Sequence, residues 1–398
     1  MCCVSERNNS TNSYFNREIF KNRNFYAALL VTTTAVLGIS SLSSALPQIV
    51  KHFGVDDSLS GLILLMFTLP GIILSPVLGF LSDKFGRKIV LNGALFIFGL
   101  GGFGYFAKDF GMLLFIRFIQ GIGAATLLSL NVAILGDAFE GDSLKFSLGI
   151  NGVVTSISLA LFPILGGILA DINPKFPFLI SFFSFFALIL FVVLFKEDNA
   201  QFINSKPQVK VRDVFTKNLT LIYLGTIFTF IVLYGCYLNY FSYLTTYRFN
   251  LSGALTGLIM GVASAVSAVV SFEINRITHF VKEELVYVSC FVFYTIAMVL
   301  FLLARGMSVL ILGSISFGIA QGINMTVTPG LLNKFASDNL RGLTLTVNGS
   351  MTNIGQTIGP LMLGFAYRFG KLDLVFLIGT IFSICGIIAT VKLISTGS

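Results

Sequence analysis

Long apolar stretches and short polar segments alternate along the whole chain. Twelve of the apolar stretches reach about the 20 residues that an α-helix needs to cross the hydrocarbon core of a bilayer. This pattern predicts an all-α integral membrane protein with twelve transmembrane helices. The predicted spans are 25–49, 59–81, 89–107, 112–136, 145–170, 176–195, 219–244, 251–272, 285–304, 307–332, 342–367 and 373–394.

One longer polar segment divides the spans into two sets of six. We predict a cytoplasmic tail at 1–24, a six-helix bundle at 25–195, a cytoplasmic linker at 196–218 and a second six-helix bundle at 219–398. The tail does not lead into a cleaved signal peptide, because the apolar core of a signal peptide has only about 7–15 residues.

Composition supports a membrane protein and gives no sign of a nucleic-acid partner. The 398 residues are 55% hydrophobic and 11% charged, with a mean hydropathy of +0.88, whereas a soluble domain has about 25% charged residues. The net charge of +8 is explained by basic loops that orient the helices in the membrane. The five cysteines show no disulfide or metal-ligand spacing.

The basic residues also indicate orientation. With the start of the chain inside, 18 of the 26 Lys and Arg residues fall in cytoplasmic segments and 7 in outer loops, while Arg117 lies within a span. Short loops rich in Lys and Arg stay in the cytoplasm. We therefore predict a cell-membrane protein with both termini and the linker on the cytoplasmic side.

The polar turn between the second and third spans carries the most specific pattern. It reads G-x-L-x-D-x-x-G-R-K and contains Gly79, Asp83, Gly86, Arg87 and Lys88. In sequence and context it resembles the signature loop of the major facilitator superfamily of transporters. The resemblance implies two parallel six-helix bundles around a central cavity.

The same turn is suited to act as a conformational latch between the two bundles. The Asp83 carboxylate is placed to face the positive N-terminal end of the eleventh span, a contact worth up to about 2 kcal/mol when partly buried. It is also placed to pair with Arg87, four residues on. The alternative is a plain cytoplasmic turn, which requires neither the acid nor the glycines.

The two halves of the sequence repeat each other in part, as expected for two pseudo-symmetric bundles. The fourth and tenth spans share a Gln-Gly-Ile motif that begins at Gln120 and at Gln321. The fifth and eleventh spans share a proline with a glycine one helical turn later, at Pro163 and Gly166 and at Pro360 and Gly364.

Arg117 is the one charge deep within a predicted span. An Arg at mid-membrane costs about 2.5–3.5 kcal/mol on insertion scales, so it usually faces a cavity and has partners. Its R-x-x-Q-G pattern resembles the family's fourth-helix motif, whose Arg is tied to the first helix and to proton coupling. The alternative is that Arg117 snorkels to the outer surface. The predicted coupling and cavity residues are Arg117, Gln120, Ser40, Ser41, Gln321 and Asn324.

Glycine and proline residues predict hinges in the fifth and eleventh spans. The fifth span partly matches the antiporter-type motif G-x8-G-x3-G-P-x2-G-G, which favours export modestly over import. Proline bends a membrane helix and glycine admits a close neighbour. The small residues spaced by four in the eighth span indicate helix packing. The predicted hinge residues are Gly149, Pro163, Gly166, Gly167, Gly359 and Pro360.

The polar residues of the spans restrict the expected substrate. All 18 Asp and Glu residues fall in loops or at span ends, so the cavity offers no carboxylate for a cation. One Arg among many hydroxyls suits a neutral or anionic small organic molecule. His52 and His279 lie in different loops, and we expect no metal site, no cofactor and no catalytic constellation. We also expect a monomer.

These observations predict a secondary active transporter, rather than an enzyme, that works by alternating access. The leading interpretation is proton-linked efflux of a drug or metabolite, with a siderophore as a conceivable cargo. A facilitative uniporter or importer of a neutral or anionic solute is the first alternative. A transport-inactive membrane receptor or scaffold is the second, although a scaffold needs no latch.

The orientation can be tested by labelling intact cells with a membrane-impermeant thiol reagent. Single cysteines that replace Asp57 and Asp171 should react from outside, and a cysteine that replaces Lys206 should react only after the cells are opened. Labelling at position 206 in intact cells would reverse the predicted orientation.

Overall fold

The structure, a computed structural model, describes residues 19–196, 214–278, 280–337 and 340–394, and these are helical without strands. Most of the predicted tail and linker lies outside the described residues. Eleven of the described helical segments are long and apolar enough to cross a membrane. The last of them, α15 (Arg341–Ile394), is interrupted at Gly370 and Lys371, whose backbones are not helical. This break gives α15 two spans, so the prediction of twelve transmembrane helices is confirmed.

The N-terminal half follows the predicted spans with one difference, in the first. The helix stops after Ser43 and a short helix restarts with Pro47 in its first turn, because proline lacks the N–H that a continuous helix requires. The elements are α2 (Arg23–Ser43), α3 (Leu46–His52), η1 (Asp57–Leu59), α4 (Ser60–Phe85), α5 (Arg87–Gly99), η2 (Leu100–Phe106), α6 (Phe110–Ala138), α7 (Gly141–Ile172), α8 (Phe176–Leu179), η3 (Ile180–Phe182) and α9 (Phe183–Leu194).

The C-terminal half contains an irregular helix that the sequence did not predict. Its first span combines α10 (Lys217–Phe230), η5 (Ile231–Tyr240) and α11 (Phe241–Phe249), and η5 is a π-helix of 10 residues. Such wide helical turns are rare and often occur at functional sites. The remaining elements are α12 (Gly253–Thr278), α13 (Glu283–Leu303), α14 (Met307–Phe335) and α15.

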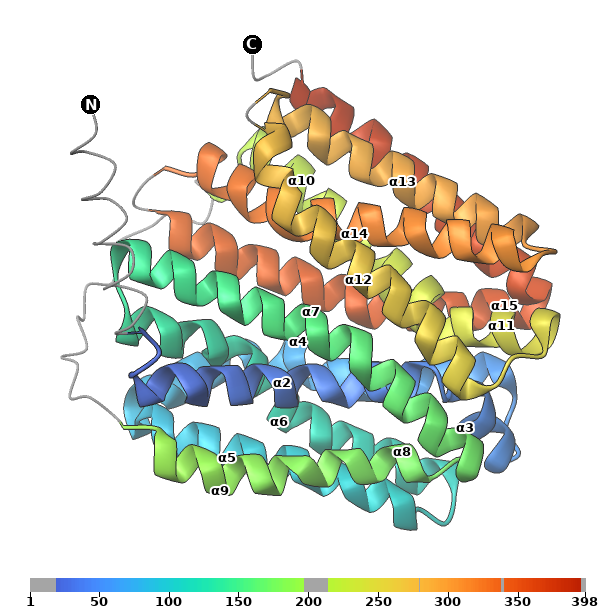
Figure 1. Cartoon of the computed structure of the whole chain (residues 1–398), viewed down its shortest axis with the longest axis horizontal. Helices are drawn as coiled ribbons and strands as arrows, with labels where there is room; N and C mark the ends of the chain where they lie inside the picture. The colour runs from blue at the N-terminus through green and yellow to red at the C-terminus, as the bar shows by residue number, and fades with distance from the viewer. Residues whose placement is uncertain (1–18, 197–213, 279, 338–339, 395–398) are drawn as a thin grey trace, which may run out of the picture.

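The two halves lie side by side with their helices roughly parallel (Figure 1). We call the end formed by α3, η1, α8 and α11 the distal end, and the end where α2 begins and α15 finishes the proximal end. Two helix pairs join the halves, α7 with α12 and α4 with α15. We call these pairs the two seams.

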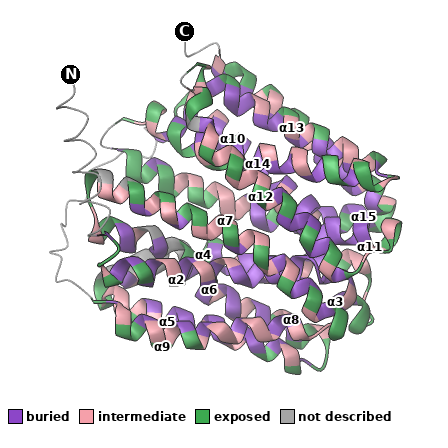
Figure 2. Ribbon diagram, viewed as in Figure 1, coloured by how far each residue is buried: buried purple, intermediate pink, exposed green. Residues whose placement is uncertain are grey.

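Burial separates interior helices from those that face the surroundings (Figure 2). In the most apolar part of α2, 72% of the residues are buried, against 28% for α7 and 33% for α12. Large apolar side chains such as Ile189, Val193 and Phe365 are exposed. A bilayer around the protein covers such residues, so the exposed apolar surface is expected of a membrane protein.

Candidate functional site

The hydrogen bonds described between the two halves lie in the distal part and in the middle of the molecule. Among the described residues, they run from the distal end down to Ser264, which donates to the Leu159 carbonyl at 3.2 Å, and to Thr357, which donates to Thr68 at 3.2 Å. Asp171 lies at the distal end of α7, and Leu159 lies 12 residues before it. At a rise of 1.5 Å per residue, the hydrogen bonds between the halves therefore extend about 18 Å inward from the distal end. The halves are therefore fastened at the distal end and in the middle.

Glycine allows the backbones to meet along the α7–α12 seam. A Cβ added at Gly167 would overlap the carbonyl of Gly253, and one added at Gly257 would overlap the carbonyl of Pro163. These contacts confirm that the small residues of α12 pack against a neighbouring helix. On the proximal part of α7, a Cβ at Gly149 would meet no described atom within 4 Å.

The α4–α15 seam is closed by polar contacts at the distal end. Asp57 accepts hydrogen bonds from the hydroxyls of Tyr247 at 3.0 Å and Tyr367 at 3.3 Å. One turn further in, Ser60 donates to the Asn239 side chain at 2.9 Å. The acceptor Asp57 belongs to the N-terminal half and both tyrosines to the C-terminal half, so these bonds exist only while the distal end is closed.

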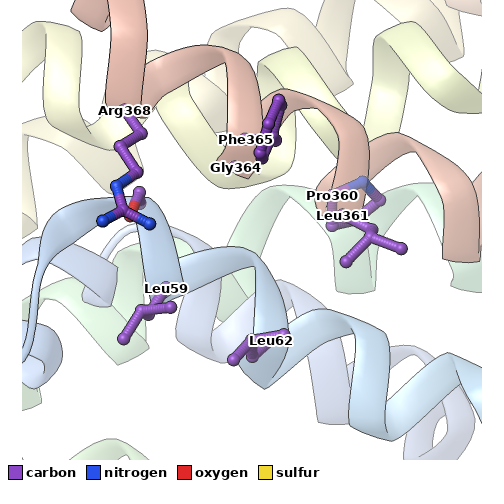
Figure 3. A pocket seen from close by; sticks show the side chains of 8 residues that line it. Leu59, Leu62, Pro360, Leu361, Gly364, Phe365 and Arg368 are labelled. Atoms are coloured by element: carbon purple, nitrogen blue, oxygen red, sulfur yellow. The ribbon is translucent and has the colours of Figure 1, made fainter.

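A half-open pocket of about 150 Å³ lies on this seam, between α4 and α15 (Figure 3). The Arg368 guanidinium reaches across it toward η1, above an apolar lining. Hydrogen bonds from the side chain and backbone of Ser58 hold the pKa of Asp56 below its ordinary value, and the charges of Lys371 and Arg368 act in the same direction. The pocket is lined by Ser58, Leu59, Leu62, Pro360, Leu361, Gly364, Phe365 and Arg368.

Arg117 is enclosed in the N-terminal half and is only 1% exposed. Its guanidinium donates to the Gly38 carbonyl of α2 at 3.0 Å, to the Ile63 carbonyl of α4 at 3.3 Å and to Gln120 at 2.6 Å. It also lies 4.4 Å from the ring centre of Phe67. Hydrogen bonds to a charged group are worth about 1.5–3 kcal/mol each, so two of them offset the cost of burying the Arg in a membrane.

This position corrects two expectations about Arg117. The side chain neither lines an open cavity in this conformation nor snorkels to the surface, because backbone carbonyls of two neighbouring helices hold it inside. Arg117 does bind the first helix, as the resemblance implied, but its partner there is the backbone carbonyl of Gly38 and not a serine side chain. The hydroxyls of Ser40 and Ser41 instead donate to carbonyls of their own helix, at 2.7 Å each.

Gln120 extends this network to a fourth element. Its side-chain amide donates to Ser181 of η3 at 2.9 Å, and a Cβ at Gly101 of η2 would overlap it. Gln120 is therefore a packing residue inside the N-terminal half, and its partner Ser181 was not identified from the sequence. Gln120 and Ser181 lie in different spans and no sequence motif contains both, so their contact could not be predicted from the sequence.

The related residues of the C-terminal half are also buried within it. Gln321 accepts a hydrogen bond from Tyr294, and Asn324 accepts one from Thr328 at 2.9 Å. They are 9% and 4% exposed. The structure therefore does not bring the six predicted cavity residues together, because the hydrogen bonds described for them are made inside their own halves.

The predicted latch is described in part. The side-chain surroundings of Gly79 and Asp83 lie outside the described residues. Gly86 separates α4 from α5 with a φ of 86°, a conformation that glycine adopts easily. Arg87 forms an ion pair with Asp137 at the end of α6, and Lys88 lies in the first turn of α5.

Of the predicted hinge residues, Pro163, Gly167 and Pro360 contact the other half across a seam, whereas Gly166 and Gly359 pack against helices of their own half and Gly149 meets no described atom within 4 Å. Gly166 packs directly against the Ser41 carbonyl, and Pro163 accepts a hydrogen bond from Ser44 at 2.6 Å. In α15, a Cβ at Gly359 would lie 3.0 Å from Ile231 of the π-helix. The Pro360 carbonyl packs against Gly61 of α4.

Comparison with known proteins identifies the class. The family model described as Major Facilitator Superfamily matches residues 28–283 and 249–396. The chain therefore belongs to the major facilitator superfamily, and it is a multi-pass membrane transporter of a small-molecule substrate.

Two curated relatives and one solved structure are similar to this chain over stated shares of their length. The chain is 26% identical to the tetracycline resistance protein, class H, of Pasteurella multocida over 374 residues, which cover 87% of this chain and 90% of that protein. It is 36% identical to the bacillibactin exporter of Bacillus subtilis (strain 168) over 157 residues, which cover 37% and 39%. The crystal structure of the nucleoside transporter NupG has a TM-score of 0.77 at 13% identity, over 94% of this chain and 98% of that one, and shows the shared fold alone.

Substitution of Arg117 tests the buried network. Arg117→Lys should lower the transport rate at least about tenfold, because an ammonium has no planar fork with which to reach Gly38, Ile63 and Gln120 together. Arg117→Ala should be at least as damaging. Transport normalised to membrane abundance measures both effects, and near-normal activity in Arg117→Lys would remove Arg117 from the functional residues.

Proposed function

We propose that this transporter exports small organic compounds in exchange for protons, by alternating access between two six-helix halves. The observation that carries the proposal is the closure of both seams by polar contacts at the distal end, between residues of different halves. A carrier that alternates needs contacts between its halves that are made in one state and broken in the other.

The predicted orientation then defines which side of the membrane the closed end faces. If the basic segments and the termini face the cytoplasm, the closed distal end faces outward. An exporter loads its cargo while its outward end is closed. The C-terminal half would then move as a unit against the N-terminal half to open the distal end.

The relatives support the export direction and two classes of cargo. The similarity to the tetracycline resistance protein suggests a tetracycline as cargo, and the similarity to the bacillibactin exporter suggests a siderophore. A neutral or anionic cargo agrees with the position of the described acids at the ends of the spans; Glu284, in the first turn of α13, is buried and forms an ion pair with Lys334 at 2.7 Å.

The proton link is supported by the resemblance of the Arg117 segment to the family's coupling motif. The partners found for Arg117 are neutral, so none of them offsets the charge of the guanidinium in the interior of one half. A nearby change in charge therefore acts on it with little screening. The uniporter alternative differs from this proposal in lacking a requirement for the proton gradient, and the importer alternative differs in the direction of transport.

The proposal is tested in a bacterial host that lacks its own exporters of these compounds. Cells that express the chain should accumulate less tetracycline and secrete more bacillibactin than cells with an empty vector, and a protonophore should abolish the difference. Higher accumulation would identify an importer, and export that persists with the protonophore would rule out proton coupling.

The predicted cytoplasmic latch is tested by Asp83→Asn in the same assay. The substitution should leave membrane abundance unchanged and lower export at least about tenfold, because an amide lacks the charge that favours a helix N-terminus. Export at the wild-type rate and equal abundance would show that the 79–88 turn only sets topology.

A further inference from the structure

A carboxylate closes the distal end of the α7–α12 seam by capping a helix of the other half. Asp171, in the last turn of α7, accepts hydrogen bonds from the backbone N–H of Gly253 at 2.7 Å and of Ala254 at 2.9 Å. Gln48 of α3 donates to the same carboxylate at 2.9 Å. The contact thus joins the end of one helix to the beginning of another across the seam.

The chemistry of this contact is that of an N-cap, but its two partners belong to different halves. The first N–H groups of a helix have no partner within the helix and carry a partial positive charge. A carboxylate satisfies both needs with charge-assisted bonds, which are stronger than neutral ones. In an ordinary cap the side chain precedes its own helix, so the cap persists whenever the helix does. Here it persists only while the halves touch.

The backbone around Asp171 is built to admit this contact. A Cβ placed on Gly253 would lie 2.8 Å from the Gly167 carbonyl and 3.0 Å from the Asp171 carboxylate. Any side chain at this position would therefore push the start of α12 away from α7. The glycine at the first position of α12 and the acid at the end of α7 act as two parts of one contact.

We propose that Asp171 is a positioning residue for transport, whose carboxylate on the N-terminus of α12 holds the distal end closed and whose release accompanies its opening. The inference rests on the alternating access proposed above. It assigns a role to a residue that the sequence placed in a plain outer loop, because no local motif distinguishes an acid that caps a distant helix.

A buried residue beside the seam reports its opening. Ser43 of α2 is completely buried and its hydroxyl contacts Met260 of α12 in the other half at 3.8 Å. Ser43→Cys changes an oxygen to a sulfur and should remain protected while the seam is closed. The rate at which a hydrophilic maleimide modifies this cysteine in purified protein, followed by mass spectrometry of its peptide, then measures the open fraction without any substrate.

Two variants weaken the contact from opposite sides. Asp171→Asn removes the charge from the N-terminal half, and Gly253→Ala obstructs the approach from the C-terminal half. In the Ser43→Cys background each should raise the modification rate roughly tenfold or more, because the open population grows as the closed one loses stability.

Two matched controls separate the contact from general effects. Asp109 caps its own helix, α6, by accepting from Met112 at 2.8 Å, so Asp109→Asn removes a charge near the same end without touching a seam. Gly306 precedes α14, where a Cβ would meet only Ser308, at 3.9 Å, so Gly306→Ala adds a methyl group in open space. Neither should change the modification rate by more than about twofold.

The outcomes decide the proposal whatever the substrate is. Unchanged modification in folded Asp171→Asn and Gly253→Ala proteins would overturn it, and so would an equal rise in Asp109→Asn. If Asp171→Asn does not yield folded protein, Gly253→Ala decides alone. Failure of both to fold would also overturn it, because the contact would then be required for folding rather than for position. Since no transport is measured, failure of the proposed export leaves this result intact.

Discussion

Direct backbone contact between the two halves is the constraint on which the rest of the structure depends. Lipid supplies no hydrophobic force between helices, so association relies on close packing and polar contacts. At Gly167 and Gly257 the glycines face carbonyl groups of the opposite helix with no room for a side chain. A contact this close is either made completely or lost, because a small separation forfeits both the packing and the hydrogen bonds. The seams therefore favour two discrete arrangements over a continuous range.

The seams can act in this way only if each half moves as a rigid unit. Arg117 contributes to that rigidity, since it binds carbonyls of α2 and α4 from its position on α6 and reaches η3 through Gln120. In the C-terminal half, Arg248 of α11 plays a comparable part by bonding the Leu302 carbonyl and Asp373. The polar groups of the spans thus hold each half together, and fewer of them cross between halves.

The apolar pattern was sufficient to predict the twelve helices, because a bilayer demands long apolar helices and leaves few other solutions, whereas their arrangement in two parallel bundles was implied by the resemblance of the 79–88 turn. The start of each span was predicted well, and the break near Pro47 and the turn at Gly86 follow from local chemistry. The partners of the polar residues were not predictable in the same way. Nothing in R-x-x-Q-G specifies that Arg117 bonds the Gly38 carbonyl instead of the nearby serines, since that choice depends on how three helices meet.

The π-helix is a second feature that could not be predicted from the sequence. Ile231–Tyr240 has the apolar composition of an ordinary helix, yet it forms wider turns, and within it Gly235 packs against the backbone of Gly359. The sequence marked Gly359 and Pro360 as a hinge, but no local pattern indicates that Gly359 packs against Ile231 and Gly235 of this span. These residues lie far apart along the chain, so only the folded structure brings them into one place.

The two carboxylates considered as latches differ in a way that fits alternation. Asp171 and Asp83 both belong to the N-terminal half, at the distal end of α7 and near the proximal end of α4. The helices available to them, α12 and α15, both belong to the C-terminal half, and α12 starts at the distal end whereas α15 starts at the proximal end. If the halves rock as rigid units about the middle, closing one helix N-terminus onto its acid draws the other N-terminus away. The same charge–dipole contact, used once at each end, then excludes a state that is closed at both ends by latches and favours the alternation that transport requires.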